Sequence, residues 1–316
     1  MPIQASPKIR VSGLTILKNG VKYDYPFREA IASTLPLVDE MIVLLGDSED
    51  STEETLRTWM QSLPEASAQK IKIHHSTWDT QKKDGSVLSV ETNKALDLCQ
   101  GSDWRVYIQA DECFHEQDTA LLKQLMQEAK ADPKVEALAL SYHHFYGNYQ
   151  VLNRDRGAYR HEVRIFKPLP GLRSFGDAQG FRFTNREKPK ALKVDALVFH
   201  YGYVRPLAVM VEKAKDFDQL FHEGGETLNE RTSHWNQFVY QYKPGLTFFR
   251  GTHPKVMEER IKSHDWTMNL EEMKKNRSFS ERLLDFKISI ENALPFRIGE
   301  FKNYRPIRRH RHFAFF

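Results

Sequence analysis

The first half of the chain alternates short apolar segments with segments of helical spacing, and a polar turn follows each apolar segment. Strands are predicted at 11–17, 41–45, 71–74 and 105–109, and helices at 25–34, 53–62, 89–99 and 118–129. Repeated strand and helix units with short connections are typical of a sheet covered by helices. The predicted fold class is therefore α/β, with a Rossmann-like, mostly parallel central sheet flanked by helices.

The second half of the chain has longer loops between its predicted strands, and more of it has helical spacing. Strands are predicted at 135–142, 162–166 and 196–201, separated by longer polar loops. Helical patterns occupy 206–223 and much of the charged region 254–300. We therefore expect a catalytic domain over residues 1–205. A mainly helical C-terminal extension over residues 206–316 is expected to pack on that domain or to continue it.

Composition excludes several classes of protein. Charged residues make up 28% of the 316 residues and aromatic residues 12%, as in ordinary folded proteins. The net charge of +4 is too small to indicate a nucleic-acid partner. The two cysteines, Cys99 and Cys113, have no zinc-site spacing and form no disulfide framework, which favours a reducing compartment. No segment approaches the roughly 20 apolar residues of a membrane span, so a soluble, cytoplasmic protein is expected.

An acidic pair ends one of the predicted strands. Asp111 and Glu112 follow the apolar run that closes at Gln109. Ligands of open α/β sheets bind outside the carboxyl ends of the strands, and hard divalent cations prefer carboxylate oxygens. The pair therefore suits a metal-bound phosphate ligand. The alternative is that these acids simply cap the helix predicted at 118–129.

A second polar segment, residues 46–52, joins the strand at 41–45 to the next helix. It places Asp47, Glu49 and Asp50 among three hydroxyl side chains. Such a loop can present carboxylates to a nucleoside while the following helix N-terminus favours a phosphate. The alternative is helix capping, because Asp50 and its hydroxyl neighbours are all favourable N-cap residues.

Several of these segments, taken in order, resemble the family-two glycosyltransferases. Lys18-Asn19 follows the first strand, and Ser48-Glu49-Asp50-Ser51-Thr52 follows the second. The series continues with Thr92-Asn93-Lys94-Ala95-Leu96, with Gly101-Ser102-Asp103-Trp104 and with Gln109-Ala110-Asp111-Glu112. These segments are similar to that family's Asp-Gly-Ser-x-Asp-Gly-Thr run, its basic helix position and its Asp-x-Asp motif. The resemblance implies a GT-A fold, a nucleotide-diphosphate sugar as donor and a divalent metal, Mn or Mg.

The resemblance also implies roles for single residues. Asp111 matches the metal-binding second acid of Asp-x-Asp, whereas Gln109 replaces the first acid with a neutral group. Gly46 stands where the family usually has a uridine-contacting acid, and Asp47 is the neighbour that could replace it. The residues expected to shape the nucleotide pocket are Lys18, Asn19, Asp47, Asp50, Lys94 and Gln109.

A histidine, His200, ends the strand predicted at 196–201. Resembling enzymes carry a histidine at the end of a late strand, and a neutral imidazole can complete a carboxylate site for manganese. His200 is therefore the second expected metal ligand. The alternative is a histidine that is hydrogen-bonded within an aromatic cluster formed with Tyr201 and Tyr203.

An inverting sugar transfer needs a general base for the acceptor hydroxyl. Asp155, Glu162 and Asp177 lie in the region where it is expected. The segment Arg164-Ile165-Phe166-Lys167 resembles the family's Arg-Leu-Phe-Arg run, after which a glycine-containing loop presents a carboxylate. This comparison selects Asp177, although an aspartate beside Gly176 is also an ordinary turn residue.

Two aromatic segments remain. Residues 142–149 combine rings with hydrogen-bonding groups, so they either line an acceptor site or form a packed strand edge. His143 and His144 would point to opposite faces of a regular strand and so could not bind one metal together. The tail, residues 304–316, mixes arginines with phenylalanines and suits peripheral contact with an anionic membrane at its inner face, or else is a frayed terminus.

The expected activity is transfer of a hexosyl group from a nucleotide sugar to a glycan or lipid-linked acceptor, as in polysaccharide biosynthesis, with inversion and metal dependence. One alternative is a nucleotidyltransferase, although Leu17-Lys18-Asn19-Gly20 is not the glycine-rich phosphate loop that such an enzyme would be expected to carry. The other is a catalytically inactive protein that binds nucleotide sugars or glycans, for which Gln109 is the main argument.

Overall fold

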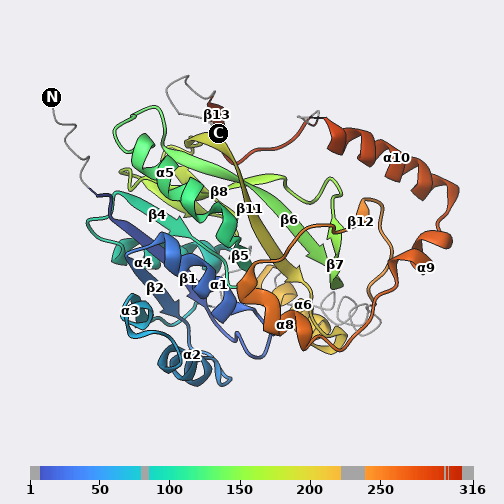
Figure 1. Ribbon diagram of the computed structural model, residues 1–316, viewed down its shortest axis with the longest axis horizontal. Coiled ribbons are helices and arrows are strands. Elements are labelled where there is room, and N and C mark those ends of the chain that lie inside the picture. The colour runs from blue at the N-terminus through green and yellow to red at the C-terminus, as the bar shows by residue number, and fades with distance from the viewer. Residues whose placement is uncertain (1–7, 80–84, 222–238, 295–296, 298, 308–316) are drawn as a thin grey trace.

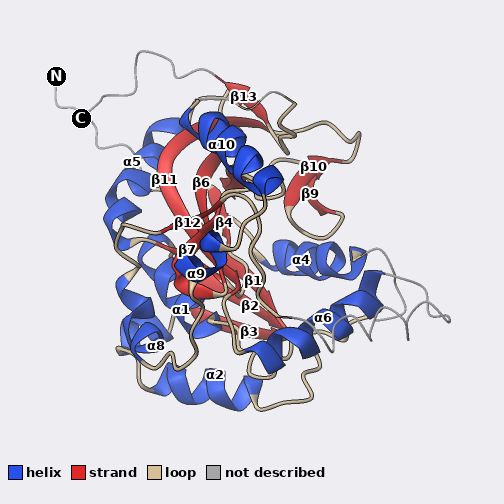
Figure 2. Ribbon diagram, turned by 90° about the vertical axis from the view of Figure 1, so that its right-hand side faces the viewer, coloured by secondary structure: helices blue, strands red, loops and turns tan. Residues whose placement is uncertain are grey.

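The computed structural model describes residues 8–79, 85–221, 239–294, 297 and 299–307, with the side chains of 217–221 left aside. Its main feature is an 11-stranded sheet (Figure 1), accompanied by a separate two-stranded sheet (Figure 2). The strands of the main sheet are β1 (Val11–Leu17), β2 (Glu40–Leu45), β3 (Ile71–His75), β4 (Trp104–Tyr107), β5 (Glu112–Phe114), β6 (Ala137–Tyr146), β7 (Asn148–Asn153), β8 (His161–Phe166), β11 (Lys190–Tyr203), β12 (Leu246–Phe248) and β13 (Arg305–Ile307). The small sheet is a hairpin of β9 (Leu172–Phe175) and β10 (Gly180–Phe183).

The first four strands form a parallel block in the order β4-β1-β2-β3. The antiparallel strand β8 joins this block to β6, and β11 then lies parallel to β6. Strands β5 and β13 are attached to β11, and β7 and β12 extend the sheet beyond β6. The prediction of a mostly parallel α/β sheet is confirmed, and the antiparallel insertions make it a mixed sheet.

Helices cover both faces of the sheet. They are α1 (Phe27–Thr34), α2 (Thr52–Gln61), α3 (Glu65–Ala68), α4 (Ser86–Leu98), α5 (Thr119–Ala129), α6 (Leu207–Phe221), α8 (Glu258–Lys262), α9 (Leu270–Lys275) and α10 (Phe279–Ala293), with short 3-10 turns η1 (Leu35–Leu37), η2 (Glu116–Asp118) and η3 (Lys255–Met257). Figure 2 shows α1 and α5 on one side of the sheet and α4 on the other. None of the described helices is long and apolar enough to cross a membrane.

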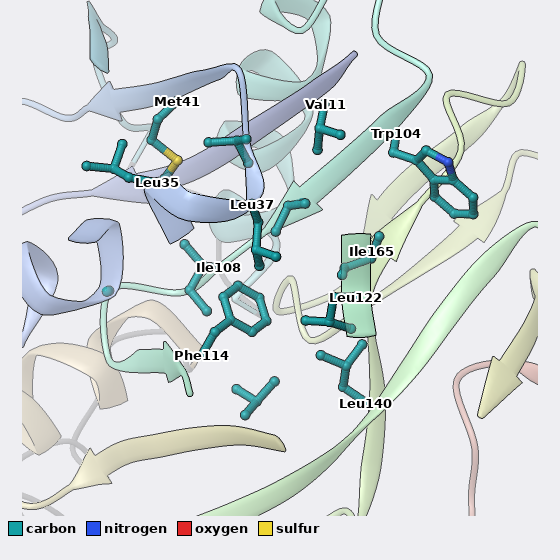
Figure 3. Close-up of a cluster of buried hydrophobic side chains, with 14 of the residues drawn as sticks. Val11, Leu35, Leu37, Met41, Trp104, Ile108, Phe114, Leu122, Leu140 and Ile165 are labelled. Carbon is teal, nitrogen blue, oxygen red and sulfur yellow. The ribbon is translucent and has the colours of Figure 1, made fainter. Parts of the chain in front are cut away.

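The alternation of side chains between the two faces of a strand explains why the sheet contributes to two separate hydrophobic clusters. In β2, Met41, Val43 and Leu45 pack into one hydrophobic cluster, while Ile42 and Leu44 pack into another. Successive side chains of a strand point to opposite faces, so a strand that is apolar at every position is buried on both. Figure 3 shows the larger cluster, in which Trp104 and Phe114 lie among leucines and isoleucines from α5, β6 and β8.

The region after residue 205 contributes strands as well as helices. Strand β12 pairs with β7, and β13 pairs with the first residues of β11. Helix α10 is tied to the loop after β7 by Arg156, which donates two hydrogen bonds of 2.9 Å to Glu291. The division into a domain of residues 1–205 and an extension of residues 206–316 stays a prediction, and the sheet is built from both parts.

Candidate functional site

A cavity of about 590 Å³ lies beyond the carboxyl ends of β1 and β4. This is the edge at which open α/β sheets bind their ligands. Residues from separate predicted motifs meet in its wall: Lys18 and Asn19 after β1, Gln109 and Asp111 after β4, and Asp177 from the β9–β10 turn. Helix α6 adds Lys213 and Asp216 to the same wall, and neither residue was predicted from the sequence.

The loops after β1 and β2 are joined by side-chain hydrogen bonds. Asn19 has the left-handed φ of 52°, and its side-chain oxygen accepts a 2.8 Å hydrogen bond from the backbone of Glu49. Asp50 accepts hydrogen bonds from the backbone of Lys22 at 2.6 Å and of Thr52 at 3.0 Å. These contacts favour the structural interpretation of Asp50, because both of its carboxylate oxygens are used to fix the loops.

Lys18 of the cavity wall forms an ion pair of 2.8 Å with Asp47, which does not itself line the cavity. Burial opposes ionisation of Asp47, but the hydrogen bonds from Lys18 and from the backbone of Trp78 outweigh it and hold the pKa of Asp47 below its usual value. Trp78 lies directly against Gly46, since a Cβ added there would be 2.5 Å from the indole Nε1. The glycine at this position therefore makes room for an aromatic ring that lines the cavity.

Asp111 is the charged centre of the cavity wall, and its side chain is only 12% exposed. Its Oδ1 lies 3.7 Å from His200 Nε2, and its Oδ2 lies 3.6 Å from Lys213 Nζ and 3.8 Å from Arg205 Nη2. Burial alone would raise the pKa of Asp111, but these three neighbours lower it below the usual value. Burial and the Arg205 charge lower the pKa of Lys213 to about 7.

Arg205 is the innermost of these cations and is fully buried. It donates to the backbone carbonyls of Tyr23, at 2.8 Å, and of Gly202. Its Nη2 has no hydrogen-bond acceptor within the described part of the chain. A buried guanidinium nitrogen with its hydrogens unused favours an anionic ligand beside Asp111.

Glu112 has a different role from its neighbour. Arg164 donates two 2.8 Å hydrogen bonds to its carboxylate, and the Tyr142 hydroxyl donates a third at 2.9 Å. Both members of the ion pair are completely buried. Glu112 therefore belongs to the core, and Asp111 alone of the two acids lines the cavity.

His200 lies on β11 opposite His144 of β6 and Glu112 of β5. The Nδ1 atoms of His200 and His144 are 2.9 Å apart, and His144 Nε2 is 2.8 Å from the carbonyl oxygen of Tyr159. Gly202 leaves space for the imidazole, since a Cβ there would be 2.6 Å from His200 Nε2 and 3.2 Å from Asp111 Oδ2. His200 and Asp111, selected from distant parts of the sequence, are thus brought together.

The donor atoms at this point suit a divalent cation. A carboxylate oxygen and an imidazole nitrogen, 3.7 Å apart, are both ligands that manganese accepts, while magnesium favours the oxygen. No group of three or more His, Cys, Asp and Glu side chains that could hold a metal occurs among the described residues. A metal held here would therefore take its other ligands from substrate oxygens and water.

Asp177 occupies the tip of the β9–β10 turn, between Gly176 and Ala178, which have φ values of 61° and 62°. It is exposed and lines the cavity. Its Oδ1 accepts a 3.2 Å hydrogen bond from the backbone of Gln179. The two competing carboxylates lie elsewhere. Asp155 is paired with Lys243 at 3.2 Å, and Glu162 is buried beside Asn303, which donates to it at 2.7 Å.

Some predicted site residues lie outside the cavity wall. Lys94 is on α4, where it pairs with Glu91 at 2.7 Å. In residues 142–149, Phe145 stacks on Tyr201 at 5.0 Å, and the rings of His143 and His144 have different surroundings, Phe249 and Tyr159 respectively. These contacts favour the packed-strand interpretation of that segment. Of the basic tail, 308–316 lie outside the described residues.

Comparison with known proteins gives a distant likeness. No protein-family model matches the chain, and no curated protein matches it. Among solved structures, S. aureus TarS 1–349 in complex with UDP-GlcNAc is similar with 11% identity and a TM-score of 0.39, over 91% of this chain and 82% of that one. The mannosyltransferase PcManGT from Pyrobaculum calidifontis, in complex with GDP-Man and Mn²⁺, is similar with 13% identity and a TM-score of 0.36, over 91% and 81%. Likeness at this level assigns no function.

Proposed function

We propose that this chain is a glycosyltransferase of the GT-A type, similar to family two, that moves a hexosyl group from a nucleotide-diphosphate donor. One observation carries the proposal. Lys18, Asn19, Gln109, Asp111 and Asp177, which come from three separate segments that resemble one family, line a single cavity. Unrelated capping and turn residues have no reason to converge on one site at the ligand-binding edge of the sheet.

The donor diphosphate is assigned to the side of the cavity next to Asp111. Lys213 and Arg205 face Oδ2 of that carboxylate, and Arg205 Nη2 has no hydrogen-bond acceptor among the described residues. Cations that are held by buried contacts before the ligand arrives stabilise a developing negative charge without reorganising. Their role is to bind the diphosphate and to stabilise it as the leaving group.

Asp111 and His200 would hold a Mn or Mg ion. When bound, such an ion supplies Lewis-acid stabilisation of the charge on the departing diphosphate. The two oxygens of the Asp111 carboxylate have different neighbours. Oδ1 faces His200, whereas Oδ2 faces Arg205 and Lys213. Gln109, in place of the first acid, adds a neutral amide to the wall.

The nucleoside is assigned to the loops after β1 and β2. Lys18, Asn19 and Asp47 offer charged and hydrogen-bonding groups there, with Asp50 holding the two loops together. Trp78 offers an aromatic face beside Gly46, where the resembling family would have an acid. We propose that the base packs on this ring. Lys94 remains a predicted contributor from α4.

Asp177 is the proposed general base. It is an exposed residue that lines the cavity, on the turn between β9 and β10. It would accept the proton of the acceptor hydroxyl as the oxygen attacks the anomeric carbon, which gives inversion. The acceptor is proposed to be a glycan or a lipid-linked sugar, as in polysaccharide biosynthesis, with the basic tail making peripheral contact with the inner face of the membrane.

A donor screen tests this proposal. UDP-, GDP- and dTDP-sugars are added with Mn²⁺, and melting temperature and slow donor hydrolysis are measured for the wild type and for Asp111→Asn. We expect one nucleotide series to raise the melting temperature and to release nucleoside diphosphate, with turnover lost in the variant. Release of pyrophosphate from a nucleoside triphosphate would instead favour a nucleotidyltransferase, and binding without turnover would favour an inactive binding protein. If no nucleotide diphosphate stabilises the chain with Mn²⁺, the transferase proposal is wrong.

A further inference from the structure

A chain of polar contacts, two of them hydrogen bonds, runs from the core to the cavity through two histidines. It starts at the backbone carbonyl of Tyr159, which lies 2.8 Å from His144 Nε2. His144 Nδ1 lies 2.9 Å from His200 Nδ1, and His200 Nε2 then faces Asp111 Oδ1 at 3.7 Å. The direction of the hydrogen bond at the Tyr159 end is certain, because a carbonyl oxygen can only accept a hydrogen bond.

The positions of the hydrogens follow from that end. His144 must carry a hydrogen on Nε2 in order to donate to Tyr159. The His144 ring lies between Tyr142 and Tyr159 and has no carboxylate among its hydrogen-bond partners in the described part of the chain, so a second ring hydrogen would create an uncompensated charge there; the neutral ring leaves Nδ1 as an acceptor. The hydrogen between the two rings therefore belongs to His200 Nδ1. A neutral His200 then has its lone pair on Nε2, the atom that faces Asp111.

We propose that His144 is a positioning residue that holds His200 in the Nδ1–H tautomer, so that His200 Nε2 presents a lone pair beside Asp111 Oδ1. The inference rests on the proposed function for the use of that lone pair, whereas the tautomer itself follows from the contacts alone. In the other tautomer, His200 Nε2 would carry a hydrogen and donate it to the Asp111 carboxylate. That arrangement would occupy both groups with each other and leave neither available to a divalent cation.

The surroundings of His144 prevent it from taking another orientation. Its ring stacks on Tyr142 with centroids 5.3 Å apart and meets Tyr159 edge-on at 4.5 Å. Tyr142 is held in turn, because its hydroxyl donates to the buried Glu112. The buried ion pair of Glu112 and Arg164 thus fixes the aromatic wall that orients His144, which links the core acid to the cavity acid.

Two substitutions separate hydrogen bonding from packing. His144→Gln retains an acceptor for His200 Nδ1–H and a donor for the Tyr159 carbonyl, whereas His144→Phe keeps a ring and removes both. His143→Phe is the matched control, because His143 is the adjacent residue of the same strand but its ring contacts Phe199 and Phe249 instead. His200→Asn identifies the His200 signals in spectra of protein labelled with ¹⁵N-histidine.

The first measurement is the tautomer of His200 in the wild type, read from long-range ¹H–¹⁵N correlations at neutral pH. We expect a protonated Nδ1 and an unprotonated Nε2 in the wild type, in His143→Phe and in His144→Gln. In His144→Phe we expect a hydrogen on Nε2. A protonated Nε2 in neutral wild-type His200 overturns the inference, and so does an unchanged tautomer in a folded His144→Phe.

The second measurement is the affinity for Mn²⁺ in the presence of UDP, or of whichever nucleoside diphosphate the donor screen selects, by electron paramagnetic resonance. We expect His144→Phe to weaken Mn²⁺ binding by about 10- to 100-fold, the usual effect of losing a partner behind a metal ligand, with His144→Gln close to wild type. Equal Mn²⁺ affinity in the wild type and in His144→Phe would overturn the role of the lone pair. If the wild type itself binds no Mn²⁺ while the tautomer changes as expected, the failure lies in the proposed metal site and not in the positioning by His144.

Discussion

Glu112 and Arg164 are joined by two hydrogen bonds of 2.8 Å in a part of the core where neither side chain is exposed. Glu112 directly follows Asp111 in the sequence, and the structure gives the two acids different surroundings. Glu112 starts strand β5 and points into the core, whereas Asp111 lies at the preceding turn and lines the cavity. The two acids should therefore respond differently to substitution.

Glu112→Gln should destabilise the fold. The change leaves the buried Arg164 charge without its counter-charge, and breaking one side of a buried pair costs about 3–5 kcal/mol. Denaturant unfolding measures the loss. Glu128→Gln, at an exposed position where the carboxylate accepts from Gln124, is the control and should change the free energy of unfolding by less than about 0.5 kcal/mol. Equal stability of the two variants would contradict the structural role of Glu112.

Asp111→Asn should abolish turnover while the chain remains folded. The amide keeps the size of the side chain but removes the negative charge that faces His200, Lys213 and Arg205. We expect donor turnover to fall by on the order of 100-fold or more. Asp195→Asn, at an exposed position of the strand that carries His200, should leave turnover unchanged. Retention of wild-type turnover by Asp111→Asn would remove this residue from the site.

Metal and nucleotide should bind together. The described residues offer no group of three or more ligand side chains, so the chain alone should hold Mn²⁺ weakly. Diphosphate oxygens would add ligands, and by linkage each partner should strengthen the binding of the other by the same factor. Calorimetric titration with Mn²⁺, with and without UDP, measures this coupling. Tight binding of Mn²⁺ without any nucleotide would show that the protein supplies more metal ligands than Asp111 and His200.

Gly46→Ala should weaken nucleotide binding through Trp78. The new Cβ would lie 2.5 Å from the indole Nε1, so the ring must move. We expect a loss of about tenfold in affinity, equivalent to roughly 1.4 kcal/mol. Fluorescence quenching by the nucleotide measures it, with Gly157→Ala as control because a Cβ there meets only the Asp155 carboxylate, at 3.3 Å. In a Trp78→Ala background Gly46→Ala should have little further effect, and full additivity of the two changes would contradict the model of a displaced ring.

Stability should fall in mild acid because of His253. Its Nε2 is 2.9 Å from the carbonyl of Tyr149 and its Nδ1 is 2.9 Å from the Tyr201 hydroxyl, and burial lowers its pKa to about 4. The unfolded chain therefore takes up a proton near pH 6.5, before the folded chain does. This contribution to stability is complete above pH 6.5 and is lost as the pH falls toward 4, by about 3 kcal/mol for a shift of this size.

Chemical unfolding between pH 7 and pH 4 checks this effect. His253→Gln, which keeps a donor and an acceptor but cannot be protonated, should show a shallower decline than the wild type. His75→Gln is the control, because His75 is exposed at the end of β3. Identical pH profiles for the wild type and His253→Gln would assign the acid sensitivity to other groups.

The sequence predicted the parallel block well because its signals are local. Strand β2 is apolar from Met41 to Leu45 and is followed by a polar turn, so its existence and its double-sided burial follow from the pattern itself. The short strands β5, β12 and β13 have three residues each and no such pattern. Each forms because a distant strand offers an open edge, and the pairing partner cannot be read from three residues.

The same reasoning explains which parts of the cavity were missed. Asp111 follows an apolar strand and His200 lies near the end of another, and polar residues at strand ends are a signal that can be recognised in one sequence. Lys213 is one of several charged residues on α6, and nothing local distinguishes it. Its place beside Asp111 depends on the path of the chain from the end of β11 into α6, past Arg205. Long-range geometry, not composition, selects these cations.

Gly202 gives the site a feature that can be searched for. Because any side chain there would overlap His200 Nε2 and approach Asp111 Oδ2, a protein with this arrangement is restricted to glycine two positions after the histidine. The resulting sequence motif, His-x-Gly at the end of a strand, can be sought together with an upstream Asp-Glu pair in sequences that are too divergent to align. Chains that keep the histidine and the aspartate but replace this glycine would have to have rebuilt the pocket around a different backbone.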